Sequence, residues 1–176
     1  QNYTLRMGTE EQAASGIINT FKTLLPQGSY ELTAYNTPEH IGISGNTATV
    51  GESEPGYMEP MPGYLFSAHQ TIDVMADDTL KVTVPVKQLV RLLNVELTVT
   101  EGDYNRVQSA TATLDGVASR IDIVTGERTT AAKSLNTLVQ NGNKFTTSFR
   151  LLGIIPTASQ KLTVSILFTN GDTQQI

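Results

Sequence analysis

The residues that could perform acid–base or metal chemistry are few in this 176-residue chain and lie apart in the sequence. There are two histidines, His40 and His69, and no cysteine, which excludes disulfides, thiolate metal sites and cysteine nucleophiles. A catalytic triad or a two-histidine metal site would need both histidines to converge with a serine or a carboxylate, and no spacing indicates this. The histidines are better explained as surface or edge residues.

The acidic residues also lack the spacing of a catalytic or calcium site. Asp73, Asp77 and Asp78 form the densest cluster, without the Asp-x-Asp-x-Asp-Gly loop and distal glutamate of an EF-hand. Asp115 is better explained by a turn, and Asp122 by the outward face of a strand. The sequence contains no GxSxG, P-loop, HExxH or dinucleotide-binding motif. We therefore expect a protein that is not an enzyme and that holds no metal or cofactor.

Three aromatic residues are the candidates for a binding surface. Tyr57, Tyr64 and Phe66 lie in or beside residues 51–64, a stretch with three prolines and three glycines that predicts an irregular surface loop. Aromatic rings in such loops stack on sugars or contact other proteins. Tryptophan is absent and aromatics make up 6% of the chain, so nothing favours sugar over protein. The three residues are predicted to contact a glycan or a protein.

Charge and hydropathy limit the partners further. The formal net charge is −5, and the lysines and arginines are scattered singly, which argues against nucleic acid and against an anionic membrane surface. Residues 80–100 are long and apolar enough to suggest a membrane span, but four charged residues interrupt them, each costing about 3 kcal/mol near a bilayer centre. The chain opens at Gln1 rather than methionine, which is compatible with a removed signal peptide.

Alternation of apolar and polar residues dominates the chain and predicts half-buried strands in antiparallel sheets. It is clearest in the second half, where the dipeptide Asp115-Gly116 predicts a hairpin turn between two strands. One segment has helical spacing instead, with apolar residues at positions 17, 21, 24 and 25, and it predicts a short helix near residues 10–25. Residues 131–140 fit a helical turn or a strand equally. The predicted fold class is therefore all-β, with one short helix.

The stretch from residue 80 to 99 indicates a boundary. Apolar residues occupy the even positions from Leu80 to Val86 and mainly the odd positions from Leu89 to Val99. Because successive strand residues face opposite sides, this change would turn the apolar face of one flat strand around midway. We therefore expect two strands in series and two β-sandwich domains, residues 1–86 and 87–176, with Lys87-Gln88 between them.

Three stretches resemble a known family. Residues 25–37, LPQGSYELTAYNT, together with 80–99 and 109–118, are similar to the fimbrillin-associated anchor and minor fimbrial lipoproteins of Bacteroidales. The resemblance implies two tandem transthyretin-like domains, export, a lipidated cysteine upstream of Gln1 and attachment at the outer membrane. No functional residue of the family can be carried over individually.

The implied role is structural. The resemblance implies a surface-attached adhesion protein, an anchor or minor subunit of fimbria-like filaments, with fimbrillin-like partners joined through β-strand contacts and a membrane connection only through the lipid anchor. The alternative is a cell-surface glycan-binding module carried by the three aromatic residues. The resemblance also makes Thr79, in Asp78-Thr79-Leu80, a candidate for O-glycosylation, because the triplet resembles a sequon of exported proteins in that bacterial group.

Overall fold

The structure is a computed structural model that describes residues 24–58, 61–76 and 79–176. Almost every regular element in this part is a β-strand, the exception being a single 3-10 turn, η1 (Tyr104–Arg106). The predicted all-β fold is confirmed. The short helix predicted near residues 10–25 lies almost entirely outside the described residues. None of the described helical segments is long and apolar enough to cross a membrane.

The described part of the chain groups into two compact units, one within residues 1–31 and 71–82 and one within residues 32–70 and 83–176. Strands β1 (Gly28–Tyr35) and β6 (Phe66–Val74) contribute to both, and they form a sheet of order β1-β6-β7 with β7 (Lys87–Gln88). These units do not follow the predicted halves, 1–86 and 87–176. That these halves are two tandem domains stays a prediction.

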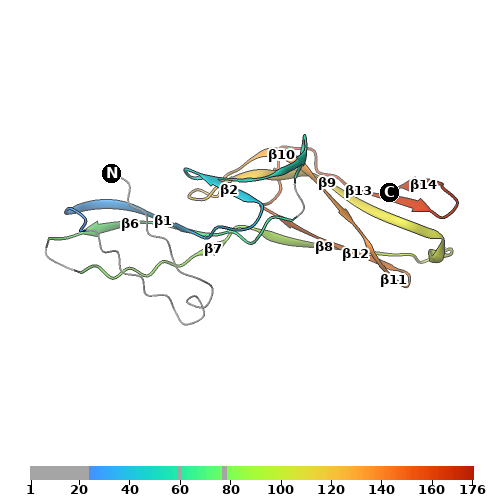
Figure 1. The fold of residues 1–176 in the computed structure, drawn as a ribbon, viewed down its shortest axis with the longest axis horizontal. Coiled ribbons are helices and arrows are strands. Elements are labelled where there is room, and N and C mark those ends of the chain that lie inside the picture. Colours follow the sequence, from blue (N-terminus) through green and yellow to red (C-terminus); the bar gives the residue numbers. More distant parts are fainter. Residues whose placement is uncertain (1–23, 59–60, 77–78) are drawn as a thin grey trace. The chain divides into compact units, whose positions relative to one another are not determined.

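The larger unit holds two further sheets (Figure 1). One has eight strands, six of which follow one another in a main path. The other two lie off this path: β3 pairs with β9, and β2 pairs with β3. In spatial order, that path runs through β14 (Thr173–Gln175), β13 (Leu162–Phe168), β9 (Val107–Asp122), β10 (Arg128–Thr137), β5 (Tyr57–Met58) and β4 (Glu52–Glu54), with β3 (Thr47–Val50) and β2 (Ile41–Ser44) alongside. The other sheet has the order β11 (Val139–Asn141), β12 (Lys144–Leu151), β8 (Arg91–Thr98).

These two sheets enclose one buried core. Phe149 of β12 is fully buried, as are Val117 and Ile121 of β9. Residues on both sides of position 86 belong to this cluster, among them Val50 of β3 and Val90 just before β8. Strand β3 reaches the core because it pairs with the end of β9, Ala48 lying opposite Ile121. The result is a sandwich in which β8 and β12 cover the inner face of the larger sheet.

The predicted hairpin turn at Asp115-Gly116 is wrong, because β9 runs straight through it as one strand of 16 residues. On β10, Lys133 lies opposite Asp115 and Ala132 lies opposite Val117, so Gly116 is an extra residue, a β-bulge. Its φ of 74° explains why glycine stands there. The extra residue also shifts the alternation by one, so that apolar side chains before and after the bulge face the same core.

Candidate strand-docking edge

The three predicted aromatic residues lie on different elements. Tyr57 is half-buried in β5, with the Lys133 ammonium 5.9 Å from its ring centroid. Tyr64 is exposed in the loop before β6, with the Arg150 guanidinium carbon 5.5 Å from its ring centroid. Lys133 lies on β10 and Arg150 on β12, so the two rings meet cations from different sheets. Each ring therefore already has one cation–π contact.

The backbone around Tyr64 is fixed by Asn36. The Asn36 amide donates to the Tyr64 carbonyl oxygen at 2.8 Å and accepts from the Phe66 backbone N–H at 2.7 Å. Phe66 is half-buried at the start of β6, opposite Gln88 of β7. These contacts hold a loop against a strand, which is a structural role. The glycan or protein contact predicted for Tyr57, Tyr64 and Phe66 stays a prediction.

Of the remaining candidate residues, Asp77 and Asp78 lie outside the described residues, and the two histidines lie on separate elements. The His69 ring nitrogen Nδ1 lies 3.0 Å from the Thr33 hydroxyl on the neighbouring strand, while His40 lies in a turn with φ 58°. Within the described ranges, no three histidine or carboxylate side chains lie close enough together to hold a metal ion. Thr79 is exposed outside any strand, and its O-glycosylation stays a prediction.

Asp122 has a well-defined structural role at the end of β9. Its carboxylate accepts hydrogen bonds from the backbone N–H groups of Thr125 at 2.7 Å and Val124 at 2.8 Å, which fixes the turn into β10. The bond from Thr125 is the main cause that lowers the pKa of Asp122 below its ordinary value, against an opposing effect of desolvation. The turn, rather than catalysis, explains this acid.

We expect replacement of Asp122 by asparagine to destabilise the protein at pH 7 more than at pH 3. The folded-state pKa is lowered, so the carboxylate stabilises the fold above the unfolded-state value of about 3.9, and this contribution is lost as the pH falls through the folded-state value. Urea unfolding at both pH values measures the difference. The exposed control Glu101→Gln should stay within about 0.5 kcal/mol of the parent protein at pH 7. An equal loss for Asp122→Asn at both pH values would contradict the prediction.

The feature with the clearest capacity to bind is the free edge of β8. Of the described strands, only β12 pairs with β8, in an unbroken antiparallel register from Arg91 opposite Leu151 to Thr98 opposite Lys144. The Val99 N–H donates to the Asn143 carbonyl oxygen. Because hydrogen-bonded and non-bonded residues alternate along an antiparallel pair, the backbone groups of the odd-numbered residues of β8 bond to β12. The backbone groups of the even-numbered residues, 92 to 98, therefore point to the other side.

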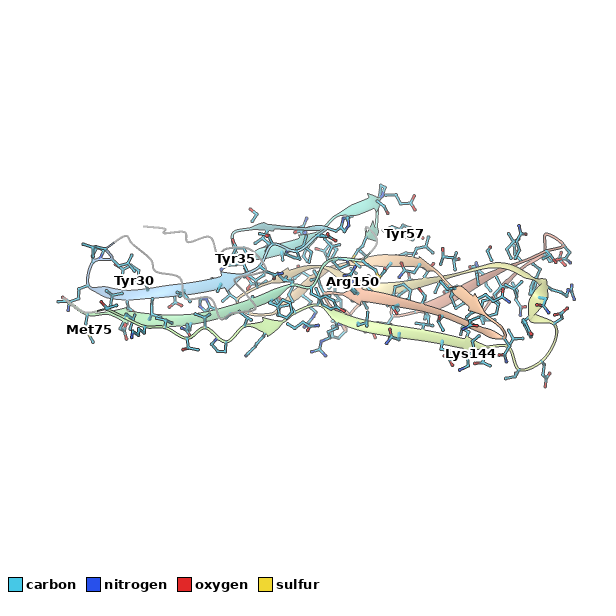
Figure 2. All side chains as sticks on the ribbon, turned by 60° about the horizontal axis from the view of Figure 1, so that its bottom comes forward. Tyr30, Tyr35, Tyr57, Met75, Lys144 and Arg150 are labelled. Atoms are coloured by element: carbon cyan, nitrogen blue, oxygen red, sulfur yellow. The ribbon has the colours of Figure 1, made fainter. Side chains whose placement is uncertain are left out.

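The β8 edge is also long and weakly protected. Among the described strands that end a sheet, β8 and β1 have eight residues each, whereas β2 has four and β4, β7, β11 and β14 have two or three. Proteins usually guard such an edge with proline, lysine or a bulge, and β8 contains none of these. Its Glu96 is already paired at 2.8 Å with the ammonium of Lys144, a residue labelled in Figure 2.

An open hollow of about 390 Å³ adjoins the start of this edge. Most of its lining residues are apolar and come from β8, the end of β12 and the segment after it. Two arginines also line it, one on β8 and one on β10. Its lining residues are Arg91, Leu92, Leu93, Arg128, Leu151, Gly153 and Ile154. No pattern in the sequence indicates this site, because the openness of an edge depends on which strands pair.

The fold defines a class: an all-β sandwich protein, in which one edge of β8 is left unpaired by the described strands. Over residues 2–176 the chain matches the family of fimbrillin-A associated anchor proteins Mfa1 and Mfa2, and it belongs to that family. The predicted resemblance is thus confirmed. None of the curated proteins matches the chain in sequence.

Two solved structures share the fold. A candidate adhesin from Bacteroides ovatus is 16% identical with a TM-score of 0.66, and the match covers 86% of this chain and 64% of that protein. The fimbrial anchor protein Mfa2 from Porphyromonas gingivalis is 11% identical with a TM-score of 0.54, and the match covers 87% of this chain and 61% of that protein. The chain therefore spans less than two thirds of either protein.

Proposed function

We propose that this protein is a surface-attached structural component of fimbria-like filaments, an anchor or minor subunit, that joins its neighbour through a β-strand docked on the free edge of β8. Family membership supports the link to fimbriae. The observation that carries the docking step is the unbroken eight-residue edge of β8, with its outward backbone groups unpaired by any described strand.

An open edge of this kind selects for one type of partner. A row of alternating N–H and C=O groups is complemented by the backbone of another extended chain, which supplies affinity, while side-chain positions set the register. The inner side chains of β8 are already committed to the core, since Val95 is buried and Leu97 packs against the buried cluster. An added strand would therefore extend the existing sheet without disturbing the sandwich.

The location belongs to the same proposal. Family membership supports a place at the cell surface, and a lipid anchor upstream of Gln1 would attach the protein to the outer membrane. The partners would be fimbrillin-like subunits.

Site-specific photo-crosslinking in the native host tests the docking edge. A photoreactive amino acid at Asn94, in the middle of β8, is expected to yield a covalent complex with a fimbrillin-like subunit, identified by mass spectrometry. The same amino acid at the exposed residue Thr169, after β13, is the control and should yield none. Crosslinking from Thr169 alone, or from neither position, would contradict the proposal.

A further inference from the structure

The segment between β6 and β7 has the sequence of a strand but is not paired as one. Residues 80–86 form no regular element in the structure, and they carry no arrow between these two labels in Figure 1. Their apolar side chains occupy alternate positions, and Leu80, Val82 and Val86 are exposed. Alternation of this kind is typical of a strand with one buried face, which these three side chains lack here.

The register of β7 on β6 fixes where the segment lies if the pairing continues. Ser67 of β6 lies opposite Lys87 of β7 in an antiparallel pair. Each step forward along β6 is one step back along its partner, so the same register places Ile72 opposite Val82. Of the described strands, only β1 and β7 pair with β6, and β7 reaches only the first two residues of β6. None of them occupies the edge of β6 beside Ile72.

The polar side chains of the segment match one face of this sheet. The Thr71 hydroxyl on β6 donates to the Glu31 carboxylate on β1 at 2.9 Å. Because side chains alternate between faces, the other odd-numbered residues of β6, among them Asp73, lie on this face as well. In the register of β7, Lys81 lies opposite Asp73. Opposite charges in such a cross-strand pair stabilise a sheet.

The apolar side chains of the segment match the other face. The even-numbered residues of β6 include Ile72 and Val74, which are both half-buried. In the same register Val82 lies opposite Ile72, and Leu80 lies opposite Val74. Pairing would bring two exposed aliphatic side chains against two half-buried ones, and the apolar area that this removes from water favours it.

A proline explains why the ladder of β7 stops after two residues. The Leu89 N–H donates to the Leu65 carbonyl oxygen at 2.8 Å, so the odd-numbered pairs are the hydrogen-bonded ones. Pro85 occupies an odd position directly beyond β7, and proline has no N–H to donate. The next odd positions, Thr83 and Lys81, do have donors. The ladder is therefore weakened at one point, while the pairs beyond that point stay possible.

We propose that residues 80–86 are a strap that closes along the side of β6 which the described strands leave open, in the register of β7. The missing donor at Pro85 keeps this closure reversible, and the structure describes the open state. The closed strap covers the edge of β6 and so prevents another chain from pairing there. This sheet is a different one from that of β8, so the inference does not depend on the docking proposed above.

Hydrogen exchange of the 176-residue chain, followed by NMR, tests closure without any substitution. In the closed strap the amides of Lys81 and Thr83 bond to β6, whereas those of Val82 and Val84 point away. Relative to the intrinsic rates, exchange should therefore be slower at Lys81 and Thr83 by about threefold or more. Equal protection at all four positions would overturn the proposal.

Replacement of the proline tests what limits closure. Pro85→Thr supplies the missing donor and should slow exchange at Lys81 and Thr83 further. Pro55→Thr is the matched control, because Pro55 is exposed between β4 and β5, and it should leave both rates unchanged. The same rates in Pro85→Thr as in the parent protein would show that Pro85 does not limit the ladder.

An engineered disulfide tests the register, since the chain has no cysteine of its own. Opposite residues of a non-hydrogen-bonded pair have Cα atoms about 4.5 Å apart, which suits a disulfide. Ile72→Cys combined with Val82→Cys should therefore oxidise about tenfold faster than Ile72→Cys combined with Val84→Cys, a diagonal pair about 7–8 Å apart. Equal rates would indicate a segment without a fixed register and would overturn the proposal.

Self-association tests the protection of the β6 edge. Thr83→Pro removes a further ladder donor and should hold the strap open, whereas Thr83→Ala keeps the N–H. Sedimentation velocity should show more self-association for Thr83→Pro than for the parent protein, and no change for Thr83→Ala. Circular dichroism checks that both variants are folded. A folded Thr83→Pro variant that associates no more than the parent protein would overturn the protective role.

Discussion

Replacement of Gly116 by alanine is expected to lower the free energy of unfolding by about 3 kcal/mol or more. Two effects add. A φ of 74° costs a residue with a side chain about 1–2 kcal/mol, and a Cβ atom would lie 2.6 Å from the Ser159 carbonyl oxygen. That oxygen belongs to backbone and cannot rotate away. The segment carrying it is tied to the bulge, since the Ile155 N–H donates to the Gly116 carbonyl oxygen at 2.9 Å.

Gly142→Ala provides the matched control. Gly142 also has a positive φ, 61°, but a Cβ atom there would meet nothing within 4 Å. Its replacement should therefore cost only the backbone strain, about 1 kcal/mol. Urea unfolding monitored by circular dichroism compares both variants with the parent protein. Equal losses for Gly116→Ala and Gly142→Ala would show that the approach of residue 159 to the bulge does not constrain the strand.

The bulge also shows how far the sequence predicts the fold. Asp-Gly favours a hairpin because glycine tolerates positive φ, but a bulge inside a strand has the same requirement. The distinguishing signal was present: buried residues at 110, 112 and 114 are followed by buried residues at 117, 119 and 121. Both sets point to one core only if a single residue is inserted between them. Alternation therefore predicted the strands, while the dipeptide misled about their connection.

The same change of alternation between Val86 and Leu89 has a different cause. Of the apolar residues before it, Leu80, Val82 and Val86 are exposed in the structure, and Lys87-Gln88 pairs with β6 as β7. Pattern alone could not distinguish an exposed apolar stretch from a half-buried strand, because both show period two. Which side of a strand is buried depends on what packs there, and that is settled by tertiary contacts.

The proposed docking edge could not be predicted from the sequence for a related reason. Residues 91–98 predict a strand, but nothing in them tells whether one or both edges are paired. The hollow brings together Arg91 and Arg128, which are far apart in sequence. Long-range pairing created the site, so single-residue chemistry did not reveal it.

The second large effect is expected at Phe149, which joins the two sheets of the sandwich. Its side chain is fully buried, and its strand, β12, is the one described partner of β8. Phe149→Ala should lower the free energy of unfolding by about 3–5 kcal/mol, through lost burial and the cavity left behind. Leu135→Ala is the control, because Leu135 lies on β10 but is 46% exposed, and it should cost about 1 kcal/mol or less.

The expected loss at Phe149 also bears on binding. Phe149 lies opposite Leu93, near the start of β8, so a cavity beneath this pair would loosen the strand that forms the proposed docking edge. Hydrogen exchange of the amides at residues 93 and 95, which bond to β12, should accelerate in Phe149→Ala beyond its global destabilisation. Unchanged protection of these amides relative to those of β13 would show that the edge is held independently of the core. In that case the rigidity of β8 would have to come from its own ladder with β12.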